Sequence, residues 1–130
     1  MIVGFTGTAS GMTEHQQAEL YGTLCIHPHL RTGFRHGDCV GADAEAHAIA
    51  LELGWPVVIH PPANPKRRAY CDGGVVKGPR PYLVRNHDIV DACDFLIAAP
   101  RQRKEVLRSG TWATVRYARK VGKEVIILEP

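Results

Sequence analysis

Short apolar runs alternate with amphipathic stretches along the chain, and this alternation predicts its secondary structure. Five runs have the length and apolar content of buried strands, at residues 2–6, 32–35, 57–60, 94–99 and 124–128. Between them, apolar positions recur every three or four residues, which predicts helices at residues 14–25, 41–53, 82–93 and 109–120. Thr13 precedes Gln16 by three residues, a spacing typical of a capping box at the start of a helix.

Regular alternation of strands and helices favours a parallel sheet in which each helix crosses over to the next strand. A chain of 130 residues is long enough for one domain with a core of its own. We therefore predict a single α/β domain over residues 1–130. It is a Rossmann-like, doubly wound parallel sheet of about five strands, in the order 3-2-1-4-5, between two layers of helices.

The periodicity disappears between residues 61 and 81. This segment holds five prolines, three glycines and five basic residues against one acid. Loops of this length inside a compact domain are commonly lids or binding loops. One interpretation is a basic flap over an anionic ligand, and another is a solvated excursion. A third is a nucleic-acid contact through residues 66–68, with Tyr70 stacking on a base.

The composition narrows the classes of function. A hydrophobic content of 45% and a charged content of 22% are typical of soluble globular proteins. No apolar run approaches the ~20 residues that span a bilayer, and the N-terminus lacks the pattern of a signal peptide. We therefore expect a cytoplasmic protein with no membrane partner. The net charge of +3 is too small to imply nucleic-acid binding by itself.

The four cysteines are scattered and form no Cys-x-x-Cys pair. This spacing indicates neither a zinc site nor a disulfide framework, and reduced thiols are the default. We predict no metal site and no resident cofactor.

The stretch from His36 to His47 joins a strand to a helix and carries the most distinctive chemistry. Gly37 and Gly41 allow a sharp turn and close approach of the backbone to a ligand. The helix that follows directs free N–H groups and its positive dipole end at the turn, which favours an anion. Asp43, in the first helical turn, either faces sugar hydroxyls or only caps the helix. An ordinary strand–helix connection, with His47 as a packing residue, is the alternative interpretation.

Two further turns have a similar character. A Gly/Ser/Thr loop follows the first strand, and small and hydroxyl residues open the last helix. In an open α/β sheet such turns meet in one crevice at the carboxyl ends of the strands. A basic side chain from the third helix can neutralise the ligand charge. We predict that the ligand-binding residues are Gly7, Thr8, Gly37, Gly41, Asp43, Arg85, Ser109, Gly110 and Thr111.

Residues 37–43, followed by Ala46 and His47, resemble the Gly-Gly-Ala-x-Gly-x-Asp-x-x-Ala-His signature of the SLOG superfamily. This superfamily includes the DNA-processing protein DprA, the Lonely Guy phosphoribohydrolases and small YspA-like proteins of bacteria and phages. Residues 109–116 resemble its second, Gly-Thr signature. The resemblance covers nearly the whole chain and is closest to the YspA-like group. It implies a Rossmann-like sheet that binds a nucleotide or nucleotide-derived ligand across both signatures, and a homodimer formed through a helical face.

The chain departs from the hydrolase pattern at one position. Lonely Guy enzymes carry Pro-Gly-Gly-x-Gly-Thr-x-x-Glu, and their glutamate takes part in cleaving the N-glycosidic bond. Depending on the alignment, Arg116 or Thr114 stands there in this chain. Because glycosyl cleavage needs a carboxylate or an equivalent group, another acid would have to serve. The candidates are Asp43 and Asp38 as catalytic residues, with Glu105 and Glu14 as substitutes.

Three functions therefore stay open. The favoured one is binding of a phosphate- and ribose-containing small molecule in the cleft. The second is hydrolysis of a nucleoside or nucleotide N-glycosidic bond. The third is a DprA-like module for single-stranded nucleic acid, whose binding would weaken steeply with salt.

Overall fold

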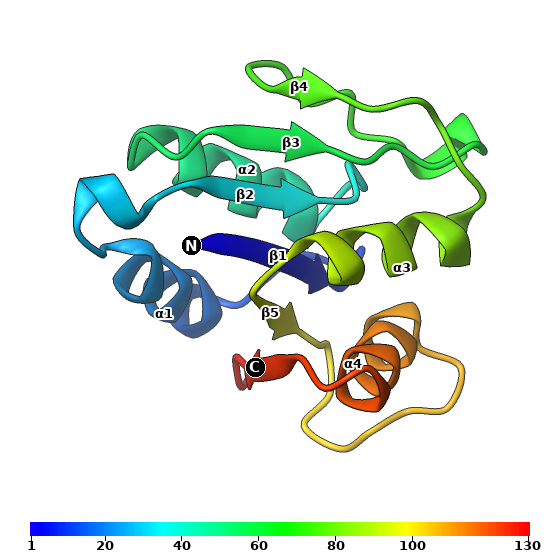
Figure 1. The fold of residues 1–130 in the computed structure, drawn as a ribbon. Helices are drawn as coiled ribbons and strands as arrows, with labels where there is room; N and C mark the ends of the chain where they lie inside the picture. The colour runs from blue at the N-terminus through cyan, green and yellow to red at the C-terminus, as the bar shows by residue number, and fades with distance from the viewer.

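The computed structural model describes residues 1–130 and has three layers, helices–sheet–helices (Figure 1). Its six strands all pair in parallel, in the order β4-β3-β2-β1-β5-β6. They are β1 (Ile2–Gly7), β2 (Gly33–His36), β3 (Val57–Ile59), β4 (Val75–Val76), β5 (Phe95–Ala99) and β6 (Glu124–Ile127). The predicted α/β class is confirmed, and so is the relative order of the five predicted strands.

The sixth strand, β4, corrects the predicted number. It lies inside the segment 61–81, which we predicted as a loop, and pairs with β3 at the edge of the sheet. Its two valines are exposed, and a two-residue strand has no alternation to detect. The same segment contains a short 3-10 helix, Pro65–Arg67.

Four α-helices connect the strands: α1 (Glu14–Leu24), α2 (Ala42–Glu52), α3 (Tyr82–Ala92) and α4 (Gly110–Lys120). The predicted capping box opens α1. The Thr13 hydroxyl accepts from the Gln16 amide, and the Gln16 side chain accepts from the Thr13 amide, both at 3.0 Å. None of the helices combines the length and the apolar character needed to cross a bilayer.

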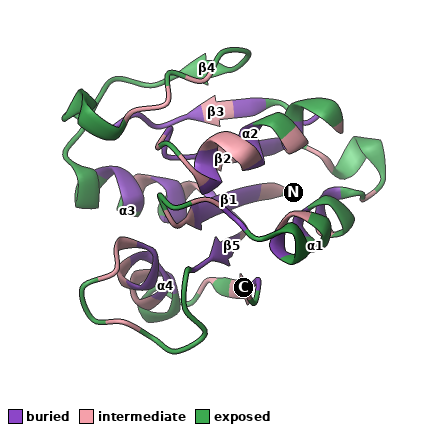
Figure 2. Ribbon diagram, turned by 180° about the vertical axis from the view of Figure 1, so that it is seen from behind, coloured by how far each residue is buried: buried purple, intermediate pink, exposed green.

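The main core lies between the sheet and the layer of α1 and α2, where buried residues are continuous (Figure 2). Phe34 on β2 is central to this core. The centroid of its ring lies 5.9 Å from that of Phe5 and 6.4 Å from that of Trp55. Burying one such side chain stabilises the fold by about 1.5–3 kcal/mol. On the other face, α3 packs on β1 and α4 packs on β5 and β6. That face of β2 and β3 has no helix in front of it in Figure 1.

Candidate ligand-binding cleft

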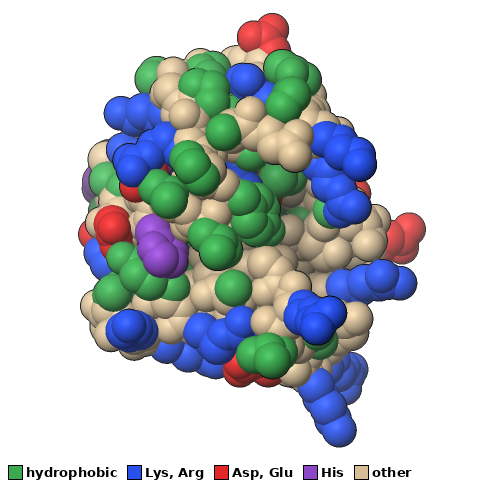
Figure 3. Space-filling view, turned by 90° about the vertical axis from the view of Figure 1, so that its right-hand side faces the viewer, with side chains coloured by type: hydrophobic (Ala, Val, Ile, Leu, Met, Phe, Trp, Pro, Cys, Tyr) green, Lys and Arg blue, Asp and Glu red, His purple; other side chains and the backbone are tan.

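A cavity of about 720 Å³ opens at the carboxyl ends of β1 and β5. We call it the cleft. Its walls are the turn at residues 7–10, the segment 62–67, Tyr82 at the start of α3, and the chain from residue 101 to Thr111 at the start of α4. Figure 3 views this end of the sheet, where Lys and Arg side chains surround a hollow with hydrophobic side chains. The volume is within the range of small-molecule sites in proteins.

Unpaired backbone amides converge on the cleft from two turns. The Thr8 amide donates to the Ala99 carbonyl at 3.0 Å, which fixes the turn after β1 beside β5. The next amide, of Ala9, makes no hydrogen bond. At the start of α4, the Ser109 hydroxyl accepts from the Trp112 amide at 3.2 Å, whereas the amides of Gly110 and Thr111 stay free. Free amides at a helix N-terminus bind anions, helped by the helix dipole.

The charged side chains that line the cleft all have one sign. Lys66 and Arg67 come from the segment after β3, and Arg101 and Arg108 from the connection between β5 and α4. None of the four forms an ion pair, and no acidic residue lines the cleft. Four uncompensated cations around one cavity create a positive potential that favours a multiply charged anion.

Tyr82 forms an aromatic wall of the cleft and depends on a glycine. A Cβ built on Gly110 would lie 1.9 Å from the Tyr82 hydroxyl oxygen. The tyrosine therefore occupies the space that a side chain at position 110 would need. One face of the Tyr82 ring is covered by Arg85, whose guanidinium carbon lies 4.9 Å from the ring centroid. Burial raises the pKa of the Tyr82 hydroxyl, which stays a neutral hydrogen-bonding group.

The structure brings five of the predicted ligand-binding residues into the cleft: Gly7, Thr8, Ser109, Gly110 and Thr111. The others lie behind its walls. Gly41 has a φ of +88°, and a Cβ on it would lie 2.3 Å from the Ala9 carbonyl oxygen. Gly37 lies against Arg85, and a Cβ on Gly37 would be 2.5 Å from Nη1 of that arginine. Both glycines make room for protein groups beneath the cleft.

Arg85 is 2% exposed and joins three segments under the cleft. Its Nη1 donates to the carbonyl oxygens of Gly37 and of His60, the latter at 3.1 Å. Its Nη2 lies 3.6 Å from the sulfur of Cys39, which lines the cleft. This arginine thus holds the turns after β2 and β3 together instead of opening into the cleft.

The two candidate catalytic carboxylates are buried in different environments. Asp43 accepts from the Cys39 amide at 3.2 Å through Oδ2, while its Oδ1 has no partner. Burial raises the pKa of Asp43 to about 6. Asp38 accepts from Arg68 Nε and from the Cys71 amide, each at 2.8 Å. Burial opposes ionisation of Asp38, but these hydrogen bonds outweigh it and lower its pKa below the ordinary value.

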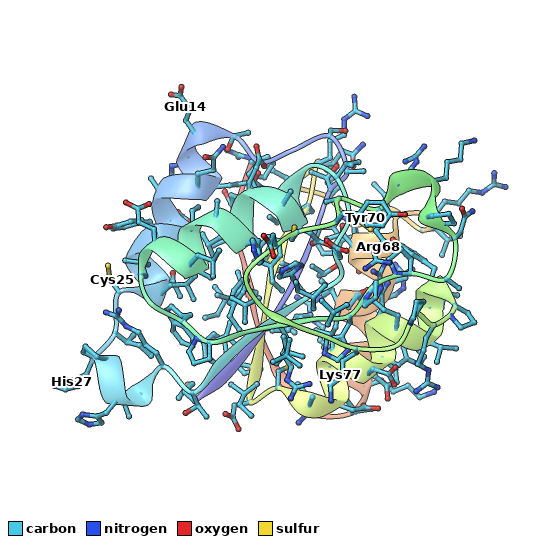
Figure 4. All side chains as sticks on the ribbon, turned by 90° about the horizontal axis from the view of Figure 1, so that it is seen from above. Glu14, Cys25, His27, Arg68, Tyr70 and Lys77 are labelled. Carbon is cyan, nitrogen blue, oxygen red and sulfur yellow. The ribbon has the colours of Figure 1, made fainter.

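Neither of these carboxylates lines the cleft, and neither does either substitute acid. Glu105 pairs with Arg116 at 2.8 Å. Glu14 lies at the start of α1, far from Arg68 and Tyr70 in Figure 4. The cleft therefore has no acid to activate water for glycosyl cleavage.

A cluster of His36, His47 and Cys71 has the composition of a metal site, with one potential ligand atom from each within 4.8 Å of the others. The hydrogen bonds of the two histidines, however, already use the ring nitrogens that a metal would need. The Asp38 amide donates to His36 Nδ1 at 3.0 Å, so the ring proton is on Nε2 and is donated to His47 Nδ1 at 2.9 Å. His47 Nε2 then donates to the Asp72 carbonyl at 2.6 Å.

Every ring nitrogen of this pair thus has a protein partner, and the His36 lone pair that a metal would need is not free. Burial lowers the pKa of His36 to about 3, so that the ring stays neutral. Burial also raises the pKa of the Cys71 thiol to about 12, which disfavours the thiolate that metals bind. The cluster is a hydrogen-bonded link between β2, α2 and residues 71–72.

Sequence reasoning did not single out Tyr82, Arg101 or Arg108 as site residues. The two arginines were visible only as charges in a polar connection. They come near Lys66 only because the sheet order brings the segment after β3 and the segment after β5 to the same end of the molecule.

No protein-family model matches the chain, and no curated protein does. Solved structures do match. A molybdenum cofactor binding protein from the phototrophic bacterium Rippkaea orientalis superposes with a TM-score of 0.71 and 22% identity, over 97% of this chain and 74% of that one. The molybdenum cofactor carrier protein of Chlamydomonas reinhardtii gives 0.62 and 23%, over 97% and 74%. DprA from Streptococcus pneumoniae gives 0.67 and 21%, over 96% of this chain and 49% of that one.

The chain shares the Rossmann-like α/β fold of these proteins. At these identities the likeness establishes the fold alone. One of the matches, DprA, is a protein of the superfamily that the two glycine-containing signatures resemble. The fold also accounts for the position of the cleft, since both signatures lie at the carboxyl ends of parallel strands.

Proposed function

We propose that the protein binds a nucleotide or a nucleotide-derived ligand in the cleft. The observation that carries this proposal is the meeting of free amides, at Ala9, Gly110 and Thr111, with four unpaired cations and no acid. A phosphate group supplies acceptors for the amides and charge for the cations. A planar ring system would pack on Tyr82.

The predicted residues divide into two roles in this proposal. Gly7, Thr8 and the residues 109–111 contact the phosphate. Gly37, Gly41 and Arg85 shape the wall from behind, and Asp43 positions the Cys39 backbone instead of contacting ribose. The ligand then depends on amides and cations for its affinity, and its sugar hydroxyls are not bound by a carboxylate.

The nearest test is thermal unfolding with AMP, ADP, ADP-ribose, NAD and cyclic nucleotides. The molybdenum cofactor belongs in the series, since two structural neighbours are named for it. A ligand present at about 100 times its Kd stabilises the folded state by about 2.7 kcal/mol. More phosphate groups should give tighter binding, so ADP should stabilise more than AMP. A series without any stabilisation contradicts the proposal.

Arg108→Gln provides the matched test of location, with Lys104→Gln as control. Both changes remove one exposed positive charge from the same connection, but only Arg108 lines the cleft. A hydrogen bond to a charged group contributes about 1.5–3 kcal/mol, which corresponds to at least a tenfold loss of affinity for ADP in Arg108→Gln. Equal loss in both variants would mean that only the overall charge matters.

Binding of single-stranded nucleic acid is the second candidate, supported by one local arrangement. Tyr70 is 61% exposed, and the Arg68 guanidinium carbon lies 4.5 Å from the centroid of its ring (Figure 4). An exposed aromatic ring beside basic residues can stack on a base. Fluorescence anisotropy with a labelled oligonucleotide at increasing salt tests this. A steep decrease in affinity with salt, together with a loss on Tyr70→Ala, would favour nucleic acid over a small ligand.

A further inference from the structure

A second cavity, of about 620 Å³, lies on the sheet face that α3 and α4 leave open. It shares no lining residue with the cleft. Arg35 on β2 and His60 after β3 form its floor, residues 77–80 form one wall, and α3 forms the other. We call it the second pocket.

The charges in the second pocket do not cancel. Arg80 pairs with Asp88 at 3.1 Å, and Asp91 accepts from the Tyr117 hydroxyl at 2.7 Å. Arg35 has only an imidazole for a partner, with its Nη1 3.2 Å from His60 Nε2. Lys77 has no ion pair or side-chain hydrogen bond at all.

The partner of Arg35 cannot neutralise it. A guanidinium only donates hydrogen bonds, so His60 Nε2 accepts and the ring carries its proton on Nδ1. Burial and the nearby Arg35 lower the pKa of His60 to about 4, which keeps the ring uncharged. A partly buried guanidinium without an anionic partner is unfavourable, because removal of a charge from water must be offset by pairing.

The opposite wall has the complementary chemistry. The carboxylates of Asp88 and Asp91 on α3 line the pocket across from the cations and retain acceptor capacity. A ligand with an anionic group at one end and hydroxyl groups at the other would satisfy both walls. The volume of the pocket, about 620 Å³, is within the range of small-molecule sites in proteins.

We infer that the second pocket binds a small phosphorylated polyol, such as a sugar phosphate, with its phosphate on Arg35 and Lys77 and its hydroxyls toward Asp88 and Asp91. This site is separate from the cleft and does not depend on the function proposed above. Its geometry links it to the cleft through Arg85, which lines the second pocket and also contacts Tyr82 in the cleft wall.

The test is titration of the ¹⁵N-labelled protein with ribose 5-phosphate, inorganic phosphate and ribose, followed by NMR. Ribose 5-phosphate should shift the amides of His60, Lys77 and Gly78 in a saturable way. Lys77→Gln should weaken this binding about tenfold, as expected for loss of one charge-assisted hydrogen bond. Lys77 is exposed, so that the variant should fold normally. Lys104→Gln, with the same charge change outside both cavities, should leave the affinity unchanged.

Three results would overturn the inference. The amides near the second pocket do not shift, or they shift equally in Lys77→Gln, or the shifts appear only at residues 8–10 and 109–111 and disappear in Arg108→Gln. Inorganic phosphate that binds as tightly as ribose 5-phosphate would overturn the assignment of the hydroxyls to Asp88 and Asp91.

Discussion

Replacement of Gly41 by alanine should be far more destabilising than the same change at another glycine with a positive φ. Gly41 has a φ of +88° and a ψ of −126°, a combination that is essentially restricted to glycine. Forcing alanine into it costs of the order of 1–3 kcal/mol. In addition, the new Cβ would lie 2.3 Å from the Ala9 carbonyl oxygen and 2.9 Å from its Cα, so that the turn at residues 8–11 must move.

Movement of this turn has a second cost. The Ala42 amide donates to the Thr8 carbonyl at 3.0 Å, and this hydrogen bond joins the start of α2 to the turn. Its loss costs about 0.5–1.5 kcal/mol. We therefore expect Gly41→Ala to reduce the free energy of unfolding by about 2–4 kcal/mol. Because the turn forms a wall of the cleft, ligand affinity should fall as well.

Urea unfolding followed by circular dichroism measures this difference, with Gly122→Ala as the matched control. Gly122 has a φ of +80°, but no atom lies within 4 Å of its Cβ position. In Gly122→Ala, only the unfavourable backbone conformation should lower the free energy of unfolding, by about 1 kcal/mol. If the two variants unfold within about 0.5 kcal/mol of each other, the close packing of Gly41 on the turn is not what stabilises this region.

Changes at three further residues test the buried charges. Asp43→Asn should abolish a pH dependence: because the folded-state pKa is about 6 and the ordinary value is 3.8, wild-type stability should fall by about 2 kcal/mol as pH rises from 4 to 6. The difference between variant and wild type in urea unfolding should grow in the variant's favour over that range, and a constant difference would refute this. Arg85→Met should cost about 2–4 kcal/mol because two buried carbonyl oxygens lose their donor, and Arg85→Lys should recover part of it. Asp38→Asn should lower the free energy of unfolding by about 2 kcal/mol at pH 7, because the ion pair with Arg68 is lost. The folded-state pKa of Asp38 is lowered, so its carboxylate stabilises the fold above pH 4. The difference in stability between variant and wild type should therefore narrow as pH falls below 4.

The sequence was sufficient for the fold because each element carries its own local signal. Thr13 and Gln16 mark the start of α1 with a capping box that the structure contains. The buried strands, such as β1 and β5, are continuous apolar runs, as expected for a parallel sheet covered on both faces. By contrast, β4 has two exposed valines and depends on pairing with β3, a long-range contact that leaves no local pattern.

The candidate site was less accessible from sequence for the same physical reason. A glycine in a turn can face a ligand or make room for a neighbouring protein group, and its local sequence is the same in both cases. Ala9 covers Gly41, and Arg85, 48 residues further along the chain, covers Gly37. Neither neighbour can be known before the chain is folded.

The two glycine-containing signatures therefore act at different depths. The second, at residues 109–111, exposes free amides directly to the cleft. The first, at residues 37–43, is covered by the turn after β1 and by Arg85. Changes in the first signature should thus affect ligand affinity and stability together, whereas changes at Gly110 should affect the position of Tyr82 and hence affinity first. A glycine motif can therefore shape a cleft from behind without lining it.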